Sequence, residues 1–534
     1  MIKWLIVILT LAGLLRIVGL NKVPPELFGD EIDVGYQAYS LLKTGRDIYN
    51  QPMPTYIRSL SEPRAPLLMY ATIPTIATAG LNEWGVRLTP AIFGILGILT
   101  VFILTYTLTK SSAVAMMSAV LLTVMPWHIH YSRAGFEVTL MLTLITLATA
   151  LFLRKRQALS YIFFALAVYT YSTAVLFVPL LVLALWVFTK PKIISWGLLV
   201  FIVLLLPFEY QTLRGQTGKR FSTISIASNP EIAQNLTRFR SYGNSIGGKL
   251  LYNRYTELTR LFTTNYVEAF SPDFLFVRGD PDYRHSYQFT GELLPVFILL
   301  LIPGIIYLVN RRQWLILAWL ILAPISSALT FDGGNHATRL FLMTVPLAII
   351  LGSGAFWIFS KSKIALVGIL IIWLYTFCQA GFYYAKIYPV ESWRWWGVGY
   401  KNSMQNVTNL AGDYSRVFIN NTYEPSLMRF LFWTKYDPAK FHKVFTIDQP
   451  QEYIVSGYDG FSLDGKYFFG AFNDKARVNG ISNLLMPNSL YLISQRDDVS
   501  GDWDWQKTPP DGVSVKVVVN NPYGQRLFYL VSKK

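Results

Sequence analysis

The sequence predicts a polytopic α-helical membrane protein with a small α/β domain at its C-terminal end. Of its 534 residues, 53% are hydrophobic and only 15% are charged, and the mean hydropathy is +0.36. Soluble proteins carry about 25% charged residues, so this chain is too apolar to be one. Long apolar runs fill residues 1–382, and the composition of residues 383–534 is polar.

Apolar runs of about 20 residues cross a hydrocarbon core as helices. On this basis we expect about eleven transmembrane helices in the domain 1–382. They lie near residues 2–20, 86–109, 112–127, 136–153, 157–170, 173–189, 192–208, 291–309, 313–330, 339–359 and 363–382. The first run resembles a signal peptide, but no small-residue cleavage site follows it, so we expect it to remain as an anchor.

The orientation follows from the short connections, because Lys and Arg stay on the cytoplasmic side. Every second connection is basic: Lys110, Arg154 to Arg156, Lys190 with Lys192, Arg311 with Arg312, and Lys361 with Lys363. We therefore expect a cytoplasmic N-terminus. The extracytoplasmic segments are then 21–85, 128–135, 171–172, 209–290, 331–338 and the residues after 383.

The formal net charge of +16 does not indicate nucleic-acid binding, because the basic residues are scattered in ones to threes instead of forming a stripe. The single cysteine, Cys378, cannot form an intrachain disulfide.

Residues 383–534 predict a separate extracytoplasmic α/β domain. Strands are expected at 416–419, 466–469, 489–493, 513–519 and 527–531, and a helix at 425–435. The domain has no Gly-rich phosphate loop, nucleophile elbow or metal-ligand spacing, so acceptor binding or structural support is favoured over catalysis.

The first outer loop, 21–85, contains two adjacent carboxylates, Asp30 and Glu31. Residues 31–44 predict a helix on the membrane surface that ends at Gly45, and Asp30 would then be its N-cap. A cap needs only one carboxylate, so the pair also indicates chemistry: one of the two acts as a general base toward a hydroxyl, and the other binds acceptor or a metal. Adjacent helical residues do not face the same way, so at most one is the base.

Three further groups of residues suit the binding of an anionic substrate. Arg64, held between two prolines, can bind a phosphate through forked hydrogen bonds, or it is a snorkelling interfacial arginine. Arg133 and Glu137, four residues apart, either neutralise each other or line a polar pocket below the outer surface. His128 and His130 nearby lack a third ligand, so the sequence predicts no metal site there.

The third group lies beside the entrances of two later spans. In the long outer loop, Asp280, Arg284 and His285 suit an anionic headgroup or a leaving phosphate, or they form ion pairs that pack the loop. His336 and Arg339, at the outer end of a later span, have the same interpretation.

At these motifs the chain resembles a known family. The runs GDEIDVGYQAYSLLKTGRDIYNQPMP, RAPLLMY, WGVRLTPAIFGI, PWHIHYSRAGFE and FSPDFLFVRGDPDYRHSYQ are similar to prokaryotic C-type glycosyltransferases that use polyprenyl-phosphate sugars. These are relatives of the dolichyl-phosphate-mannose protein mannosyltransferases and of the lipid A aminoarabinose transferase. The resemblance covers roughly residues 5–400, and the order of the motifs carries it.

The resemblance implies the C-type fold and an inverting transfer of mannose or a similar sugar from a polyprenyl-phosphate donor to an acceptor hydroxyl. The family's first-loop pair matches Asp30 and Glu31, with Asp30 as the expected base. The second-loop carboxylate matches Glu137, and the basic residue before the Pro-Leu segment matches Arg64. Inversion places the base opposite the leaving group, and a phosphate leaving group needs cations, not an acid.

The resemblance also implies location and partners. The loop 209–290 is too short for the β-trefoil insertion of eukaryotic relatives, which favours a bacterial or archaeal plasma-membrane enzyme. The expected partners are membrane lipid, the lipid-linked donor and a protein or glycolipid acceptor. No cofactor is assigned, and a divalent cation stays open. The alternatives are a transporter or lipid flippase, although no inverted repeat is evident, and an oligosaccharyltransferase or ligase that uses a diphosphate-linked glycan.

Overall fold

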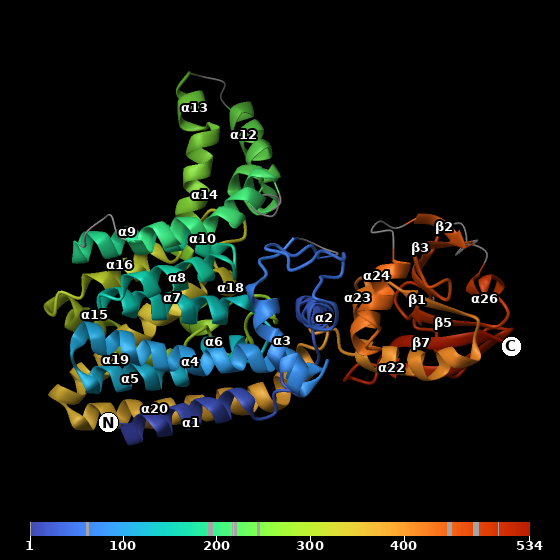
Figure 1. Ribbon diagram of the computed structural model, residues 1–534, viewed down its shortest axis with the longest axis horizontal. Helices are drawn as coiled ribbons and strands as arrows, with labels where there is room; N and C mark the ends of the chain where they lie inside the picture. Colours follow the sequence, from blue (N-terminus) through green and yellow to red (C-terminus); the bar gives the residue numbers. More distant parts are fainter. Residues whose placement is uncertain are drawn as a thin grey trace.

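The computed structural model contains a bundle of apolar helices and a seven-stranded sheet beyond one end of the bundle, with one helix, α2, between them (Figure 1). It describes residues 2–59, 63–190, 196–215, 217, 222–242, 246–445, 451–455, 457–473, 480–499 and 501–534. Most helices of the bundle run roughly along the long axis of the molecule, and the sheet lies at one end of that axis (Figure 1).

Each apolar segment expected from the sequence is mostly helical in its described part. The helices of this region are α1 (Ile2–Ile17), α2 (Gly29–Thr44), α3 (Leu67–Ala79), α4 (Glu83–Thr109), α5 (Ser112–Thr123), α6 (Pro126–Tyr131), α7 (Glu137–Leu153), α8 (Gln157–Val168), α9 (Thr173–Thr189), α10 (Trp196–Leu213), α15 (Ile298–Asn310), α16 (Trp314–Leu322), α17 (Ile325–Ala328), α18 (Ala337–Leu340), α19 (Thr344–Lys361), α20 (Lys363–Phe382) and α21 (Tyr388–Glu391).

Only some of these helices have the length and composition of a membrane span. Within the described part of the chain, four stretches are long and apolar enough to cross a membrane: Glu83–Thr109, Trp196–Leu213, Ala337–Lys361 and Lys363–Glu391. The pair α5 and Pro126–Ser132 meets the same criterion but is bent by 62°, at Pro126, which cannot continue a helix without a break. The other apolar helices are shorter, so eleven spans stay a prediction.

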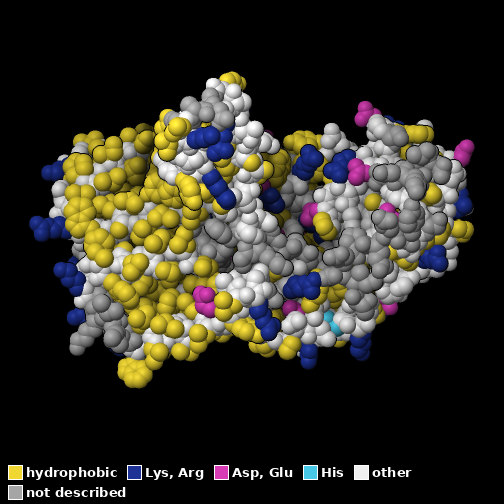
Figure 2. All heavy atoms as spheres, turned by 90° about the horizontal axis from the view of Figure 1, so that it is seen from above, with side chains coloured by type: hydrophobic (Ala, Val, Ile, Leu, Met, Phe, Trp, Pro, Cys, Tyr) yellow, Lys and Arg dark blue, Asp and Glu magenta, His cyan; other side chains and the backbone are white. Residues whose placement is uncertain are grey.

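The basic connections lie at helix ends. Lys110, Lys190 and Arg311 are the C-terminal caps of α4, α9 and α15. On the face shown in Figure 2, Lys and Arg side chains gather at the end of the bundle farthest from the sheet. The surface of the bundle between that end and the sheet domain is largely hydrophobic. Lys192, predicted on the same side, lies outside the described residues. The orientation in the membrane stays a prediction.

The long loop 209–290 contains a helical hairpin that projects sideways from the bundle (Figure 1). Its helices are α12 (Pro230–Tyr242), α13 (Ile246–Leu251) and α14 (Arg254–Glu268), and a short π-helix, η2 (Asp273–Val277), follows.

The C-terminal part forms a mixed sheet in the order β2-β3-β4-β1-β5-β7-β6. Its strands are β1 (Arg416–Asn420), β2 (Gln451–Val455), β3 (Tyr458–Leu463), β4 (Tyr467–Phe472), β5 (Ser489–Ser494), β6 (Val513–Asn520) and β7 (Arg526–Lys533). β1 pairs in parallel with β4 and β5, and the other pairs are antiparallel. The five strands expected from the sequence are present, and β2 and β3 were not expected.

Helix α2 joins the bundle to the sheet. Its buried Ile32 and Tyr36 share one hydrophobic core with Phe430 and Phe432 of α23 (Ser426–Trp433), the helix expected at 425–435. The Tyr36 hydroxyl donates to the carbonyl oxygen of Tyr436 at 2.9 Å. Helices α22 (Tyr400–Leu410) and α24 (Pro438–Val444) complete this layer. The same core includes Ile76 of α3 and Val86 of α4, so α2 packs against both the bundle and the sheet domain.

Candidate active site

The two adjacent carboxylates lie in the first turn of α2 and have opposite surroundings. The helix begins at Gly29 with Phe28 as N-cap, so the expectation that Asp30 is the N-cap is wrong. Asp30 is instead a first-turn residue whose side chain is 44% exposed, whereas Glu31 is completely buried. Successive helical residues point about 100° apart, which separates the two side chains.

The carboxylate of Glu31 is saturated by hydrogen bonds. Arg87 donates to it from Nε to Oε1 at 2.8 Å and from Nη2 to Oε2 at 2.9 Å. The main-chain N–H groups of Gly135 and Phe28 donate to the same oxygens at 2.9 and 3.3 Å. The contact with Phe28 is the one in which the side chain of the third helical residue accepts from the N–H of the N-cap residue, as in a capping box. Glu31 therefore connects α2, α4 and the segment before α7.

Arg87 was not singled out from the sequence. It is fully buried, and its remaining N–H groups donate to the carbonyl oxygens of Leu20, Pro24 and Glu26 at 2.7 to 3.1 Å. The sequence did contain a signal for this role, because Arg87 lies just inside the apolar run 86–109. Charged residues within such a run usually face a polar interior.

Asp30 belongs to a cluster of three carboxylates around Arg64, which we call the Arg64 cluster: Asp30, Asp33, Arg64 and Glu137. Arg64 Nη2 lies 2.5 Å from Asp30 Oδ1. Its Nε lies 3.7 Å from Asp33 Oδ2, and its Nη1 lies 3.7 Å from Glu137 Oε1. Arg64 itself is 8% exposed. Three carboxylates around one guanidinium leave this cluster with an excess of negative charge.

The electrostatics of the cluster follow from burial and from this arginine. Burial raises the pKa of Asp33 to about 6, although Arg64 acts in the opposite direction. Burial alone would lower the pKa of Arg64. The nearby carboxylates of Asp30, Asp33 and Glu137 have the larger effect, so the pKa of Arg64 is raised overall. Arg64 thus stays a cation, and Asp30 is the cluster's most exposed carboxylate.

Arg133 and Glu137 face different ways. The Nε, Nη1 and Nη2 atoms of Arg133 donate to the carbonyl oxygens of Leu15 and Val23, and the side chain is buried. Glu137 begins α7 and faces Arg64. Arg133 precedes the helix, so the helical spacing that would pair the two does not apply.

His128 and His130 also point apart. Nδ1 of His128 lies 2.8 Å from Nη2 of Arg16, and Nδ1 of His130 lies 3.0 Å from the Tyr384 hydroxyl. Nε2 of His130 lies 2.7 Å from the carbonyl oxygen of Arg284.

Arg64 and Glu137 line a mainly apolar cavity of about 550 Å³, which we call the apolar cavity. Arg339 lines it too, and its Nη1 donates to Thr330 Oγ1 at 2.6 Å and pairs with Asp332. The remaining wall combines apolar or aromatic residues (Tyr56, Pro63, Ala65, Val168, Tyr171, Val175, Leu176, Phe208, Ile224 and Leu329) with polar ones (Thr170, Ser172, Thr173, Glu209, Thr212, Thr217, Ser326 and Thr330). Cations within apolar walls suit a lipid with an anionic head.

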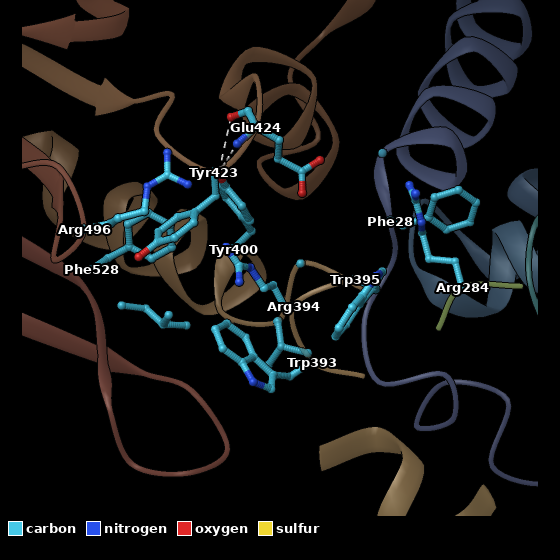
Figure 3. A pocket seen from close by; sticks show the side chains of 14 residues that line it. Phe28, Arg284, Trp393, Arg394, Trp395, Tyr400, Tyr423, Glu424, Arg496 and Phe528 are labelled. Carbon is cyan, nitrogen blue, oxygen red and sulfur yellow. Dashed lines mark hydrogen bonds between the residues drawn. The ribbon is translucent and has the colours of Figure 1, made fainter. Parts of the chain in front are cut away.

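A second cavity, of about 480 Å³, lies between the start of α2 and the sheet domain, and we call it the interdomain cavity. Figure 3 shows Phe28 and Arg284 on one side of it and Tyr400, Tyr423 and Arg496 on the other. Its other lining residues are Gly29, Trp393, Arg394, Trp395, Gly397, Val398, Glu424, Leu527 and Phe528. Aromatic rings alternate here with arginines.

The predicted residues of the long loop divide between two places. The side chain of Arg284 pairs with Asp282 at 2.6 Å and lines the interdomain cavity. Asp280, His285 and His336 come together in a separate group. Of the residues beside the later span, His336 therefore joins this group, whereas Arg339 lines the apolar cavity.

Sequence comparisons find no match: no protein-family model and no curated protein matches the chain. Comparison of structures does. The chain is similar to the crystal structure of ArnT from Cupriavidus metallidurans bound to undecaprenyl phosphate, with a TM-score of 0.53 and 12% identity over 99% of this chain and 98% of that chain. It is also similar to the oligosaccharyltransferase AglB from Archaeoglobus fulgidus, with a TM-score of 0.47 and 14% identity over 81% of this chain and 63% of that one.

The ArnT match spans both parts of the molecule, the helical bundle and the C-terminal sheet. The order of helices, loops and sheet agrees with the fold that the sequence motifs implied. This chain therefore has the C-type glycosyltransferase fold that ArnT represents.

Proposed function

We propose that this protein is a plasma-membrane glycosyltransferase that transfers a sugar, mannose or a similar hexose, from a polyprenyl-phosphate donor to an acceptor hydroxyl on the extracytoplasmic side. The fold is consistent with this class, and one similar solved structure is that of ArnT bound to undecaprenyl phosphate. The proposal depends on one observation above all: the Asp30–Arg64 pair lies between two cavities of different character.

We infer that position from two lining residues, because Asp30 itself is in the lining of neither cavity. Gly29, next to Asp30, lines the interdomain cavity, and Arg64 lines the apolar cavity. A hydroxyl from the interdomain cavity and a lipid-linked sugar from the apolar cavity would meet at Asp30. Its exposed carboxylate is accessible to a substrate, which the buried Glu31 is not.

The reaction assigns a role to each group. The acceptor oxygen attacks the anomeric carbon and forms the new glycosidic bond, while Asp30 takes the hydroxyl proton. The bond between the anomeric carbon and the phosphate oxygen breaks, and the electron pair leaves with the lipid phosphate. Attack from the side opposite the leaving group inverts the anomeric configuration.

The leaving phosphate requires cations, and the apolar cavity supplies Arg64 and Arg339. Both side chains are only 8% exposed, so their charge acts through little solvent. Glu137, at the same cavity, keeps Arg64 in place or accepts hydrogen bonds from the sugar's hydroxyl groups. We assign Glu31 to positioning, since all its acceptor capacity goes to Arg87 and main-chain donors.

The interdomain cavity suits a sugar-bearing acceptor, a glycolipid or a glycosylated protein. Aromatic faces such as Trp393, Trp395 and Tyr423 pack against the apolar faces of sugar rings, and Arg394 and Arg496 recognise anionic substituents.

The test is sugar transfer by purified protein in nanodiscs, with polyprenyl-phosphate-mannose and related donors and a panel of peptide and glycolipid acceptors. Asp30→Asn keeps the size of the side chain but removes the base, so we expect transfer to fall by about 100-fold or more. Asp511→Asn, in an exposed turn of the sheet domain, is the matched control and should transfer at the wild-type rate.

Equal rates for Asp30→Asn and the wild type would overturn the role of Asp30. Transfer from diphosphate-linked donors alone would indicate the ligase class. Donor movement across the bilayer without transfer would indicate a flippase.

A further inference from the structure

The group formed by Asp280, His285 and His336 is brought together from two loops. Asp280 and His285 lie between η2 and α15, and His336 directly precedes α18. Asp280 Oδ2 lies 3.1 Å from Nδ1 of His285 and 3.8 Å from Nδ1 of His336. One ligand atom from each residue lies within 4.8 Å of the others.

The carboxylate at the centre of this group is held by the main chain. Oδ1 of Asp280 accepts from the N–H of Asp282 at 2.9 Å, and Oδ2 accepts from the N–H of Ala337 at 2.8 Å. The N–H of Asp280 donates to Oε1 of Glu292 at 3.1 Å. Both loops therefore fix the direction of this carboxylate, as outer-shell contacts do in metal sites.

The two imidazole rings are held as well. The rings of His285 and His336 stack with centroids 4.7 Å apart, and His285 also lies 5.9 Å from the ring of Phe136. Their side chains are 17% and 16% exposed, so neither ring is fully shielded from solvent.

We propose that Asp280, His285 and His336 bind one divalent cation of the zinc class, with a fourth coordination position open. Zinc takes imidazole nitrogen and carboxylate oxygen at about 2.0–2.2 Å, which places the ligand atoms of a tetrahedral site about 3.4 Å apart. The separations of 3.1 and 3.8 Å bracket that value. Magnesium and calcium prefer oxygen ligands alone, so two imidazoles select against them.

Residues close to this group in the chain line both cavities. Arg284, next to His285, lines the interdomain cavity, and Arg339, three residues after His336, lines the apolar cavity. Three protein ligands and one exchangeable position are typical of zinc sites that bind an oxygen ligand. An anionic oxygen such as that of a phosphate fits this position. This inference does not depend on the proposed transfer reaction.

The first experiment measures metal content. Full-length protein in detergent is stripped with a chelator, reloaded with Zn²⁺, desalted and analysed by mass spectrometry of the metal. We expect about one zinc per chain for the wild type, and at least a tenfold lower content for Asp280→Asn, His285→Gln and His336→Gln. His442→Gln, which alters a histidine in α24, is the matched control and should keep the wild-type content.

The second experiment uses only the wild type, so it does not depend on whether the variants fold. Wild-type protein loaded with Co²⁺ should show the strong visible absorption of a four-coordinate ion, and added inorganic phosphate should change that spectrum. A wild type without zinc, equal zinc in folded variants and wild type, or the weak spectrum of a hydrated octahedral ion would each overturn the site. A four-coordinate spectrum that phosphate leaves unchanged would overturn the open position.

Discussion

At the scale of single residues, burial separates two carboxylates that are adjacent in the sequence. Glu31 forms a forked, fully buried ion pair with Arg87, while Asp30 remains exposed beside Arg64. A buried pair contributes little net stability compared with apolar residues, but removal of one partner leaves an uncompensated charge and costs about 3–5 kcal/mol. The two residues should therefore respond differently to the same substitution.

Glu31→Gln should destabilise the fold, whereas Asp30→Asn should leave its stability nearly unchanged. Gln cannot balance the charge of Arg87, so we expect a loss of about 3 kcal/mol, measured as a lower Tm in detergent or nanodiscs. The double variant Glu31→Gln with Arg87→Gln should cost less than the sum of the single variants, because neither charge is then left alone. Additive losses would show that the pair is not coupled.

The sequence singled out Asp30, Glu31 and Arg64 as candidate site residues, because charges stand out in an apolar chain. It did not reveal their partners. Glu31 and Arg87 are 56 positions apart, and no spacing rule reaches that far. The same holds for His285 and His336, whose rings stack only because two loops meet. Proximity of this kind is a property of the tertiary packing.

At the scale of elements, α2 packs between the bundle and the sheet domain, and a glycine sets how closely it packs. A Cβ on Gly35 would lie 2.5 Å from Cε2 of Phe432 in α23 and 2.7 Å from Cγ2 of Val86 in α4. These distances are too short for real contacts, so only glycine permits α2 to lie between α4 and α23 at this separation.

Gly35→Ala should therefore destabilise the protein, although alanine favours a helix over glycine by up to about 1 kcal/mol. Overpacking of a filled core costs about 1–3 kcal/mol, which exceeds that gain. A lower Tm is the expected result. Gly412→Ala is the matched control, because nothing lies within 4 Å of its Cβ position. An equal or higher Tm for Gly35→Ala would show that the interface adjusts freely.

The elements themselves were largely predictable, since apolar runs and alternating strands leave clear patterns. The helix after Phe28 was expected two residues late, because Phe28 is a poor N-cap and Asp30 a good one. Strand β3 was missed since Asp459 and Gly460 disfavour strands. Gly460 lies opposite Gly470 of β4, and the two strands are too close there for a side chain. A Cβ on Gly460 would lie 1.9 Å from the carbonyl oxygen of Phe469.

At the scale of the whole molecule, the loop before α2 is clasped by the start of α22. The carboxylate of the buried Glu26 accepts from the N–H of Gly399 at 3.0 Å and from the N–H of Lys401 at 2.6 Å. Lys401 pairs with Glu83 of α4, and Nη1 of Arg429 donates to the carbonyl oxygen of Leu27 at 3.0 Å. These contacts join the loop before α2 and the start of α4 to the part of the chain that begins α22.

This clasp makes stability depend on pH. Burial raises the pKa of Glu26 from 4.5 to about 7, although Arg429 and the two N–H donors act in the opposite direction. The folded protein thus binds the proton more tightly than the unfolded chain, and this contribution is fully present below about pH 4.5. It is lost as the pH rises through 7, and the difference amounts to about 3 kcal/mol.

We therefore expect the Tm of the wild type to fall between pH 5 and pH 8, and this fall to be smaller in Glu26→Gln. Gln cannot ionise, so its Tm loses the part of the pH dependence that Glu26 supplies, whatever the substitution does to stability at a single pH. The test compares the slope of Tm against pH in the wild type with that in Glu26→Gln. The other titrating groups are common to both proteins, so a difference between the slopes comes from Glu26. Identical slopes would show that Glu26 does not take up its proton in this range, and that its carboxylate stays ionised against the N–H groups of α22.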